Sequence, residues 1–354
     1  MDYLGRIKAA ILLLIMIIST LSACSVNSEK RYEATFLELF DTASVIVGYA
    51  ESEEEFSEYS RKAYDELKVY NELFDIYNDY EGVNNIKTIN DNAGIKPVKV
   101  DQKIIDFLMY SKIMCEKTDG KVNVAFGAVL SLWHDHRTAG LDNPEKATLP
   151  DYEELKERNL HTDIDDMVID EEASTVYLKD PEMSLDVGAI AKGYAVEKVA
   201  LFMQEEGFKN GMISVGGNVR TFGNKFDESG KEIPWSVGIQ NPDLSSDEKT
   251  LYVLNLSGYS LVTSGIYERY YTVNGKQYHH IINPDTLMPT EYFASISIVC
   301  QDSGMADALS TAVFNMPYEE GCKMVEELDG VEALWVFPDQ TMKYSSGFQA
   351  MIKD

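Results

Sequence analysis

The chain has few basic residues, and this shortage limits the partners that it can bind. Its 354 residues include 31 Lys and Arg against 59 Asp and Glu, which gives a net charge of −28. No run of basic residues offsets this charge, and it would repel a phosphate backbone, so no nucleic-acid partner is expected. Hydrophobic residues still make up 45% of the chain, which is enough for a large core and excludes a disordered protein.

Cysteine is also scarce. One of the four cysteines is Cys24, and the other three, Cys115, Cys300 and Cys322, are widely spaced and odd in number. Without a CxxC pattern they predict neither a disulfide framework nor a thiolate metal site. The sequence also lacks HExxH, GxSxG, P-loop and GxGxxG patterns, so zinc protease, serine hydrolase, P-loop and dinucleotide-fold functions lose their usual signatures.

The N-terminal segment is typical of a secretion signal. Arg6 and Lys8 precede an apolar run over 9–18, which is too short to span a bilayer core of about 30 Å. The following Leu-Ser-Ala-Cys resembles a bacterial lipobox that ends at Cys24. We therefore expect a signal peptide over 1–23, a lipidated tether over 24–34 and a catalytic domain over 35–354. The protein would then be lipid-anchored at the extracytoplasmic face of the cell membrane. An ordinary cleaved signal peptide is the alternative.

Hydrophobic periodicity predicts an α+β fold that forms one compact unit, because helices and strands alternate without a regular βαβ rhythm. No internal repeat or flexible linker divides the chain. The predicted helices cover 53–74, 104–117, part of 186–206, 305–315 and 319–328, and one short helix lies in the acidic surface stretch 142–166. The predicted strands cover 42–49, 212–215, 235–240, 251–256, 295–300 and 333–337.

Two segments contain residues suited to binding an anion and its counter-ion. In the segment 186–195, a strand end is expected to lead directly into a helix, whose free N–H groups and Lys192 could hold a phosphate. Asp307 and Thr311 lie four residues apart, so they share one face of a predicted helix, which we expect to be exposed. Their oxygens suit Mg²⁺. The alternatives are tight helix packing at 186–195 and a simple helix-dipole role for Asp307.

The histidines predict no metal site. His279 and His280 would point to opposite faces of a strand, so at most one of them can face a ligand. His134 and His136 lie in a polar stretch that is expected to be a loop, where they would be solvated or would cap a helix.

Taken together, the segments LDVGAIAKGYAVEK (185–198), SVGGNVRTFG (214–223), VTSGIYERYY (262–271), YHHIINP (278–284) and ADALSTAVF (306–314) resemble the ApbE-type FAD:protein FMN transferase family. This resemblance implies transfer of FMN from FAD to a Thr or Ser hydroxyl of an extracytoplasmic flavoprotein, with Mg²⁺ present and AMP released. It further implies that the acceptor protein carries Asp-x-x-Ser/Thr followed directly by Gly/Ala, Ala/Ser and Ser/Thr. This chain has no match to that whole pattern, so the acceptor would be a different protein.

The resemblance also assigns residues. It implies that Mg²⁺ is held by Asp307, Thr311 and the carbonyl of Ala189, and that His280 or Asp307 is the general base. The residues implied to contact FAD are Phe40, Lys121, Val122, Asn123, Asp186, Lys192, His280 and Ile281.

The chain departs from the family pattern at three places. Phe40-Asp41-Thr42 stands where the family has Met-Gly-Thr, Asn123 replaces an aspartate, and Leu287 replaces a glycine in the segment 283–287, which has also lost an acid. None of these changes removes a predicted metal ligand. Two other functions remain open: an Mg²⁺-dependent FAD pyrophosphatase that uses water as the nucleophile, and a flavin-binding lipoprotein without catalysis.

Overall fold

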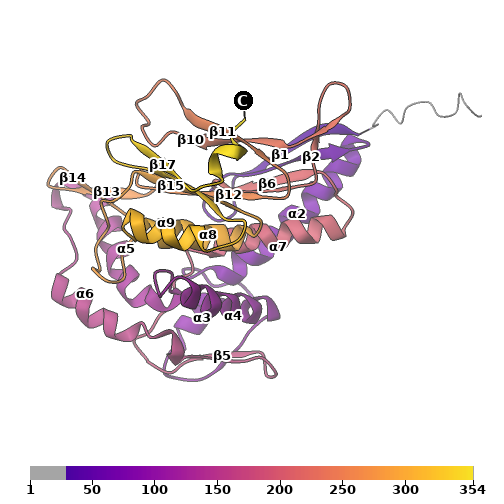
Figure 1. Ribbon diagram of the computed structural model, residues 1–354. Coiled ribbons are helices and arrows are strands. Elements are labelled where there is room, and N and C mark those ends of the chain that lie inside the picture. The colour runs from indigo at the N-terminus through magenta and orange to yellow at the C-terminus, as the bar shows by residue number, and fades with distance from the viewer. Residues whose placement is uncertain (1–28, 354) are drawn as a thin grey trace, which may run out of the picture.

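A large antiparallel sheet forms the upper half of the molecule in the computed structural model, which describes residues 29–353 (Figure 1). The predicted signal peptide and Cys24 lie outside the described residues. The sheet strands, in spatial order, are β1 (Lys30–Phe36), β2 (Ser44–Ala50), β6 (Gly211–Val215), β7 (Asn218–Phe222), β12 (Ser260–Gly265), β15 (Ser295–Cys300), β16 (Glu332–Val336) and β17 (Met342–Tyr344).

Helices cover one face of this sheet and a hairpin covers the other (Figure 1). The helices are α2 (Glu53–Phe74), α7 (Ala191–Glu205), α8 (Ser303–Phe314) and α9 (Tyr318–Glu326), and the hairpin strands are β10 (Trp235–Gln240) and β11 (Thr250–Leu256). The start of α2 is fixed by Ser52, whose side chain accepts a hydrogen bond from the N–H of Glu55. Trp235, Leu254 and Leu256 of the hairpin pack against the sheet in a second apolar cluster.

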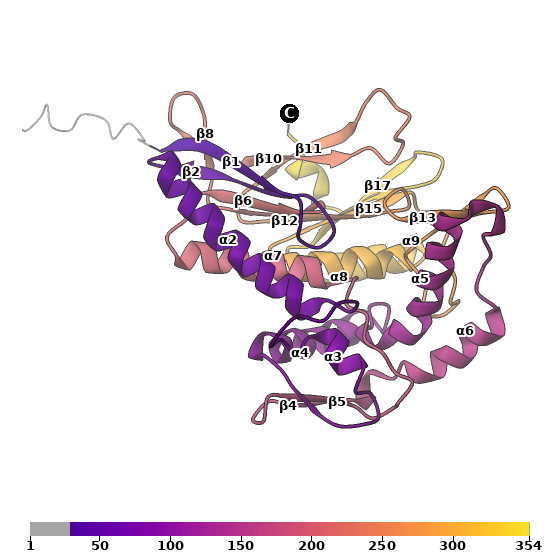
Figure 2. The ribbon, with the colours of Figure 1, turned by 180° about the vertical axis from the view of Figure 1, so that it is seen from behind.

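A lower layer lies beneath these helices and is best seen from behind (Figure 2). It contains a small three-stranded sheet in the order β3-β5-β4 and several helices. Its helices are α3 (Ile86–Asn90), α4 (Gln102–Lys117), α5 (Gly127–Asp142) and α6 (Tyr152–Arg158), with short 3₁₀ turns at Val124–Phe126, Pro144–Lys146, Asn159–His161 and Ile164–Asp166. The remaining strands are β3 (Val98–Lys99), β4 (Met167–Asp170), β5 (Thr175–Leu178), β8 (Lys225–Phe226), β9 (Glu232–Ile233), β13 (Tyr270–Val273) and β14 (Lys276–His279), and a last 3₁₀ turn covers Phe348–Met351.

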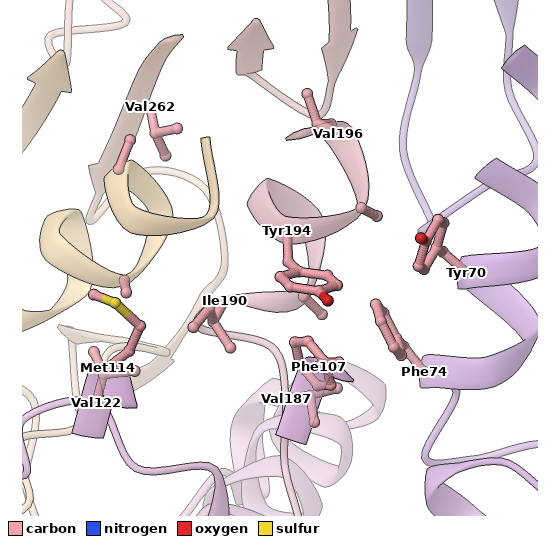
Figure 3. Close-up of a cluster of buried hydrophobic side chains, with 14 of the residues drawn as sticks. Tyr70, Phe74, Phe107, Met114, Val122, Val187, Ile190, Tyr194, Val196 and Val262 are labelled. Atoms are coloured by element: carbon pink, nitrogen blue, oxygen red, sulfur yellow. The ribbon is translucent and has the colours of Figure 1, made fainter. Parts of the chain in front are cut away.

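The two layers are joined through Tyr194 of α7 (Figure 3). Its ring lies 5.1 Å from that of Phe107 on α4 and 6.1 Å from that of Phe74 on α2, and the rings of Phe74 and Phe107 are 4.2 Å apart. Aromatic clusters of this kind contribute strongly to core stability. The start of α7 is therefore held rigidly where the layers meet.

The architecture confirms the predicted α+β class, and most predicted elements are present. Three expectations were wrong. No strand leads into the segment at 186, whose backbone is instead hydrogen-bonded to the 3₁₀ turn at Val124–Phe126 and to Gly127. His134 and His136 lie within α5 and not in a loop. The sheet also begins at Lys30, five residues before the expected domain start at 35. Across residues 29–353, no helix combines the length and the apolar character needed to cross a membrane.

Candidate active site

A cavity of about 580 Å³ opens where the sheet layer meets the lower layer. Its walls come from loops and helices that are distant in sequence, including the β1–β2 loop, the start of α7, the middle of α8, the β6–β7 turn and α5. Every described residue that the sequence assigned to flavin or metal lines this cavity. These residues are Phe40, Lys121, Val122, Asn123, Asp186, Ala189, Lys192, His280, Ile281, Asp307 and Thr311.

Helices α7 and α8 are locked together by two reciprocal hydrogen bonds. The N–H of Gly193 on α7 donates to Oδ2 of Asp307 on α8 at 2.8 Å, and the N–H of Ser303 on α8 donates to Oε2 of Glu197 on α7 at 2.9 Å. The helices approach so closely that a Cβ at position 193 would lie 2.3 Å from the carbonyl oxygen of Ser303. Glycine at 193 therefore permits the contact that orients Asp307.

Three residues that line the cavity have an oxygen atom without a hydrogen bond in residues 29–353. Because the N–H of Gly193 donates to Asp307, it does not bond to the carbonyl of Ala189 four residues earlier, as it would in a regular helix. Among the described residues, that carbonyl, the Thr311 hydroxyl and Oδ1 of Asp307 accept or donate no hydrogen bond. Carboxylate, carbonyl and hydroxyl oxygens are the donors that Mg²⁺ prefers.

Asp307 is buried, with 6% of its surface exposed, so the expectation of an exposed helix face was wrong. Burial raises the pKa of Asp307, whereas the nearby Lys192 ammonium lowers it. A cation beside this carboxylate would favour its charged form. Asn218 lines the same part of the cavity, and its side-chain amide also lowers the pKa of Asp307. Its buried Nδ2 nevertheless has no acceptor with hydrogen-bond geometry in residues 29–353, so a ligand oxygen could satisfy this donor.

No cluster of three or more His, Cys, Asp or Glu side chains that could hold a metal ion is found in the part of the chain that the structure describes. A metal site here would therefore need the hydroxyl and carbonyl oxygens as well as the Asp307 carboxylate. The three free oxygens described above fit that requirement.

His280 lies in another part of the cavity and is fixed in one tautomer. Its Nδ1 lies 3.1 Å from the carbonyl oxygen of Arg269, which can only accept, so Nδ1 carries the proton. Burial lowers the pKa of His280 to about 3, so the ring is neutral near pH 7 and Nε2 is an acceptor. His279 points away from the cavity, donates from Nε2 to the carbonyl of Thr290 at 2.7 Å and accepts from the N–H of Ile281. The opposite orientations predicted from sequence are confirmed.

Three of the predicted flavin contacts already have partners within the protein. Asn123 accepts from the N–H of Ala125 and donates to the carbonyl of Thr162, and Lys121 forms an ion pair with Asp285. Oδ1 of Asp186 accepts from the N–H of Gly188 at 2.9 Å. These side chains shape the wall of the cavity, and any contact with a ligand would use only part of their hydrogen-bonding capacity.

Many polar residues of the cavity wall were not assigned from the sequence, among them Tyr77, His134, Arg137 and Arg269. The hydroxyl of Tyr77 lies 3.1 Å from Nδ1 of His134, whose Nε2 lies 3.7 Å from Oδ2 of Asp186. Burial lowers the pKa of His134, although Asp186 opposes this effect. Apolar residues at 129, 132 and 133 were the available signal, because this spacing continues a helix through His134 and Arg137.

The cavity thus has two ends, which we name by their exposure. The inner end contains Ala189, Lys192, Asn218, Asp307 and Thr311. The outer end contains Tyr77, His134, Arg137, Arg269 and His280, and Tyr77 there is 61% exposed.

Comparison with known proteins gives consistent matches. Residues 40–335 match the ApbE family. The chain is 34% identical over 272 residues to the FAD:protein FMN transferase of Treponema pallidum, covering 74% of this chain and 73% of that protein. It is 29% identical to an FAD:protein FMN transferase of Klebsiella pneumoniae, covering 78% and 83% of the two chains.

Solved structures agree with the sequence matches. The ApbE protein of Thermotoga maritima superimposes with a TM-score of 0.77 at 28% identity, covering 92% of this chain and 100% of that one. The flavin transferase ApbE of Vibrio cholerae superimposes with a TM-score of 0.72 at 24% identity, covering 91% and 99%.

Proposed function

This chain belongs to the ApbE family, and from that premise we propose that it is an FAD:protein FMN transferase. The observation that carries the proposal is the inner end of the cavity. There, the Ala189 carbonyl, the Thr311 hydroxyl and Oδ1 of Asp307 make no hydrogen bond within residues 29–353, and their residues line the same cavity as Lys192 and Asn218. A diphosphate with its counter-ion is the group that this arrangement suits.

We infer that Mg²⁺ would be held by Asp307, Thr311 and the carbonyl of Ala189. When bound, it would neutralise charge on the diphosphate of FAD. Lys192 supplies a further positive charge, and its own backbone N–H has no hydrogen-bond partner in residues 29–353 and could also donate to a phosphate oxygen. Phosphoryl-type transfer depends mostly on positioning and charge neutralisation, so the protein needs no nucleophile of its own.

In the proposed reaction, the hydroxyl oxygen of a Thr or Ser in the acceptor protein attacks the phosphorus on the FMN side of the diphosphate. The P–O bond to the AMP phosphate breaks, AMP leaves, and the proton of the hydroxyl is released. His280 suits the attacking hydroxyl better than Asp307 does, because Nε2 of its neutral ring can accept a hydrogen bond. Asp307 already accepts from Gly193, and its other oxygen is assigned to the metal.

The acceptor and the location of the enzyme are part of the same proposal. The Leu-Ser-Ala-Cys segment supports lipidation at Cys24 and attachment to the extracytoplasmic face of the membrane, where the acceptor flavoprotein would also lie. Incorporation of labelled palmitate in the wild type, but not in Cys24→Ala, would test this attachment.

AMP release from FAD tests the chemistry. The purified protein is incubated with FAD and Mg²⁺, with and without a peptide that carries Asp-x-x-Thr. AMP that appears only with the peptide, together with a fluorescent flavin–peptide adduct, is the expected result. AMP and free FMN without the peptide would instead identify a pyrophosphatase. FAD binding without AMP in either sample would identify a flavin carrier and contradict the proposed catalysis.

A further inference from the structure

Two arginines at the outer end of the cavity have no partner within the described part of the chain. Arg137 projects from α5 and Arg269 from the loop between β12 and β13, and both line the cavity. In residues 29–353, neither guanidinium forms a hydrogen bond or an ion pair with another residue. This is unusual in a protein whose acids outnumber its basic residues by 59 to 31.

Both guanidinium groups belong to the wall of the same cavity. Burial and the positive charge of Arg269 lower the pKa of Arg137. Like charges repel each other, and they do so more strongly where solvent is partly excluded. Holding them together is therefore unfavourable without an anion, and an anion between them would turn this cost into attraction.

The nearby acids do not supply that anion. Asp186 attracts Arg137, but its Oδ1 is bonded to the N–H of Gly188 and its Oδ2 faces His134. Asp41, which also acts on Tyr77, and the exposed Glu268 line the cavity as well, but neither forms an ion pair with either arginine in the described residues. The remaining neighbours, Tyr77 and the neutral His280, carry no negative charge.

The diphosphate of FAD has its own counter-charges elsewhere. Lys192 is the cation that acts on Asp307, and the predicted Mg²⁺ ligands lie at the same inner end. The arginines instead act on His134 and His280 at the outer end, where Arg269 is exposed. A second anion, carried by the acceptor polypeptide and bound at the outer end, would explain why two arginines lie there.

We propose that Arg137 and Arg269 form an oxyanion subsite that binds a carboxylate side chain of the acceptor polypeptide. This inference rests on the proposed function, because it concerns the second substrate of that reaction. Guanidinium groups bind carboxylates with paired, directional hydrogen bonds, so the subsite would fix the register of the acceptor segment as well as attract it. It would also give an acidic enzyme a local point of attraction for an acidic peptide.

The test compares three variants with the wild type: Arg137→Ala, Arg269→Ala and the double variant. The probe is a synthetic peptide with the Asp-x-x-Thr pattern, and its adduct formation gives kcat and KM, while flavin fluorescence gives the Kd of FAD. Each single variant is expected to raise the KM for the peptide by about tenfold, as expected for lost charge-assisted hydrogen bonds. The Kd of FAD is expected to change by less than about twofold, because no FAD contact is assigned to the pair.

Arg61→Ala is the matched control. Arg61 lies on α2, is exposed, lines a separate hollow and, like the pair, has no hydrogen-bond or ion-pair partner in the described part of the chain. This variant is expected to leave both constants unchanged. Arg137→Lys and Arg269→Lys keep the charge but lose the paired hydrogen bonds, so they should restore only part of the loss.

A second peptide, Asn-x-x-Thr, identifies the group that is recognised. The asparagine peptide should bind the wild type as weakly as the aspartate peptide binds the double variant. Combining the asparagine peptide with the double variant should lower the affinity little further, because both changes remove the same interaction. A rise in the Kd of FAD with an unchanged peptide KM would overturn the proposal and assign the pair to FAD. Equal losses for both peptides would exclude carboxylate recognition. If the wild type forms no adduct, the proposed function fails, whereas fluorescence anisotropy of the labelled peptides still decides whether the subsite exists.

Discussion

The inner and outer ends of the cavity are built in different ways. The inner end is placed by backbone contacts between two buried helices, so Asp307 is held by a neighbouring N–H and is 6% exposed. The outer end is formed by side chains from α5 and the β12–β13 loop, and the two arginines there have no protein partner in residues 29–353. A rigid inner end suits chemistry that needs exact positioning, whereas an open, charged outer end suits a substrate that arrives as a polypeptide.

Replacing Asp307 should disrupt the inner end most. Asp307→Asn keeps an acceptor for the N–H of Gly193 but removes the charge, so Mg²⁺-dependent turnover should fall on the order of 10³-fold. Because burial already disfavours the charged form, the folded protein should not lose stability. AMP release and the Tm without metal measure the two effects. Turnover within about tenfold of wild type would contradict the metal assignment.

The buried ion pair of Glu197 and Arg220, which holds the start of α8 in place, is the next feature to test. Glu197 and Arg220 form a buried ion pair with N–O distances of 2.8 and 3.3 Å, and Glu197 also accepts from the first N–H of α8. Glu197→Gln leaves the Arg220 charge uncompensated, so the free energy of unfolding should fall by about 3 kcal/mol. Chemical denaturation measures this loss, and kcat should fall with it, because α8 carries Asp307.

Glu206→Gln is the control for this prediction. Glu206 directly follows α7 and pairs with Lys62 at 3.0 Å, but the pair lies at the surface. Surface pairs contribute about 0–1 kcal/mol, so this variant should change stability little. Equal losses in the two variants would show that burial of the Glu197 pair has no special effect.

The two ends also differ in how far the sequence could predict them. The inner end was predictable because its residues lie in two short segments and helix periodicity puts Asp307 and Thr311 on one face. The burial of that face was not predicted, although almost every residue around Asp307 is small or apolar, which is typical of a helix buried on all sides. The departure from helical bonding at Ala189 depends on the contact with α8, and no local pattern shows it.

The outer end could not be assembled from the sequence because its residues meet only through tertiary packing. Trp133 on α5 donates from its indole N–H to the carbonyl of Leu287 at 3.1 Å, and Tyr271 packs in the same apolar cluster. This packing brings α5 to the β13–β14 hairpin and thereby brings Arg137 to Arg269. The two arginines are far apart in sequence, and the residues around His134 are polar. For these reasons no sequence pattern predicted that Arg137 and Arg269 would line the same end of the cavity.

The pH dependence of stability tests how strongly His280, which is partly exposed, is desolvated at the outer end. The pKa of His280 is about 3 in the folded protein and near 6.5 in the unfolded chain, so the unfolded state binds more protons between these values. Stability should therefore fall as the pH drops below about 6.5, at most by about 1.4 kcal/mol per pH unit from this residue. Denaturation of His280→Gln at pH 7 and pH 5.5 should show a smaller drop than the wild type. His136→Gln, on α5 beside Thr148, is the control, and an equal drop in both variants would contradict burial of His280.

The smallest effect concerns the turn that carries Phe40 to the cavity wall. Leu39 to Thr42 forms a tight turn, closed by the N–H of Thr42 and the carbonyl of Leu39 at 3.2 Å, and its central residues Phe40 and Asp41 have φ of 55° and 53°. This left-handed backbone favours glycine, which is the residue that the family pattern has at position 41. Asp41→Gly should therefore stabilise the protein by about 0.5–1 kcal/mol, after the greater freedom of glycine in the unfolded chain is taken into account. Thermal denaturation measures this gain, with Asp41→Ala as the control that keeps a Cβ and should not stabilise. A lower Tm for Asp41→Gly would show that the aspartate side chain contributes more to this turn than its backbone strain costs.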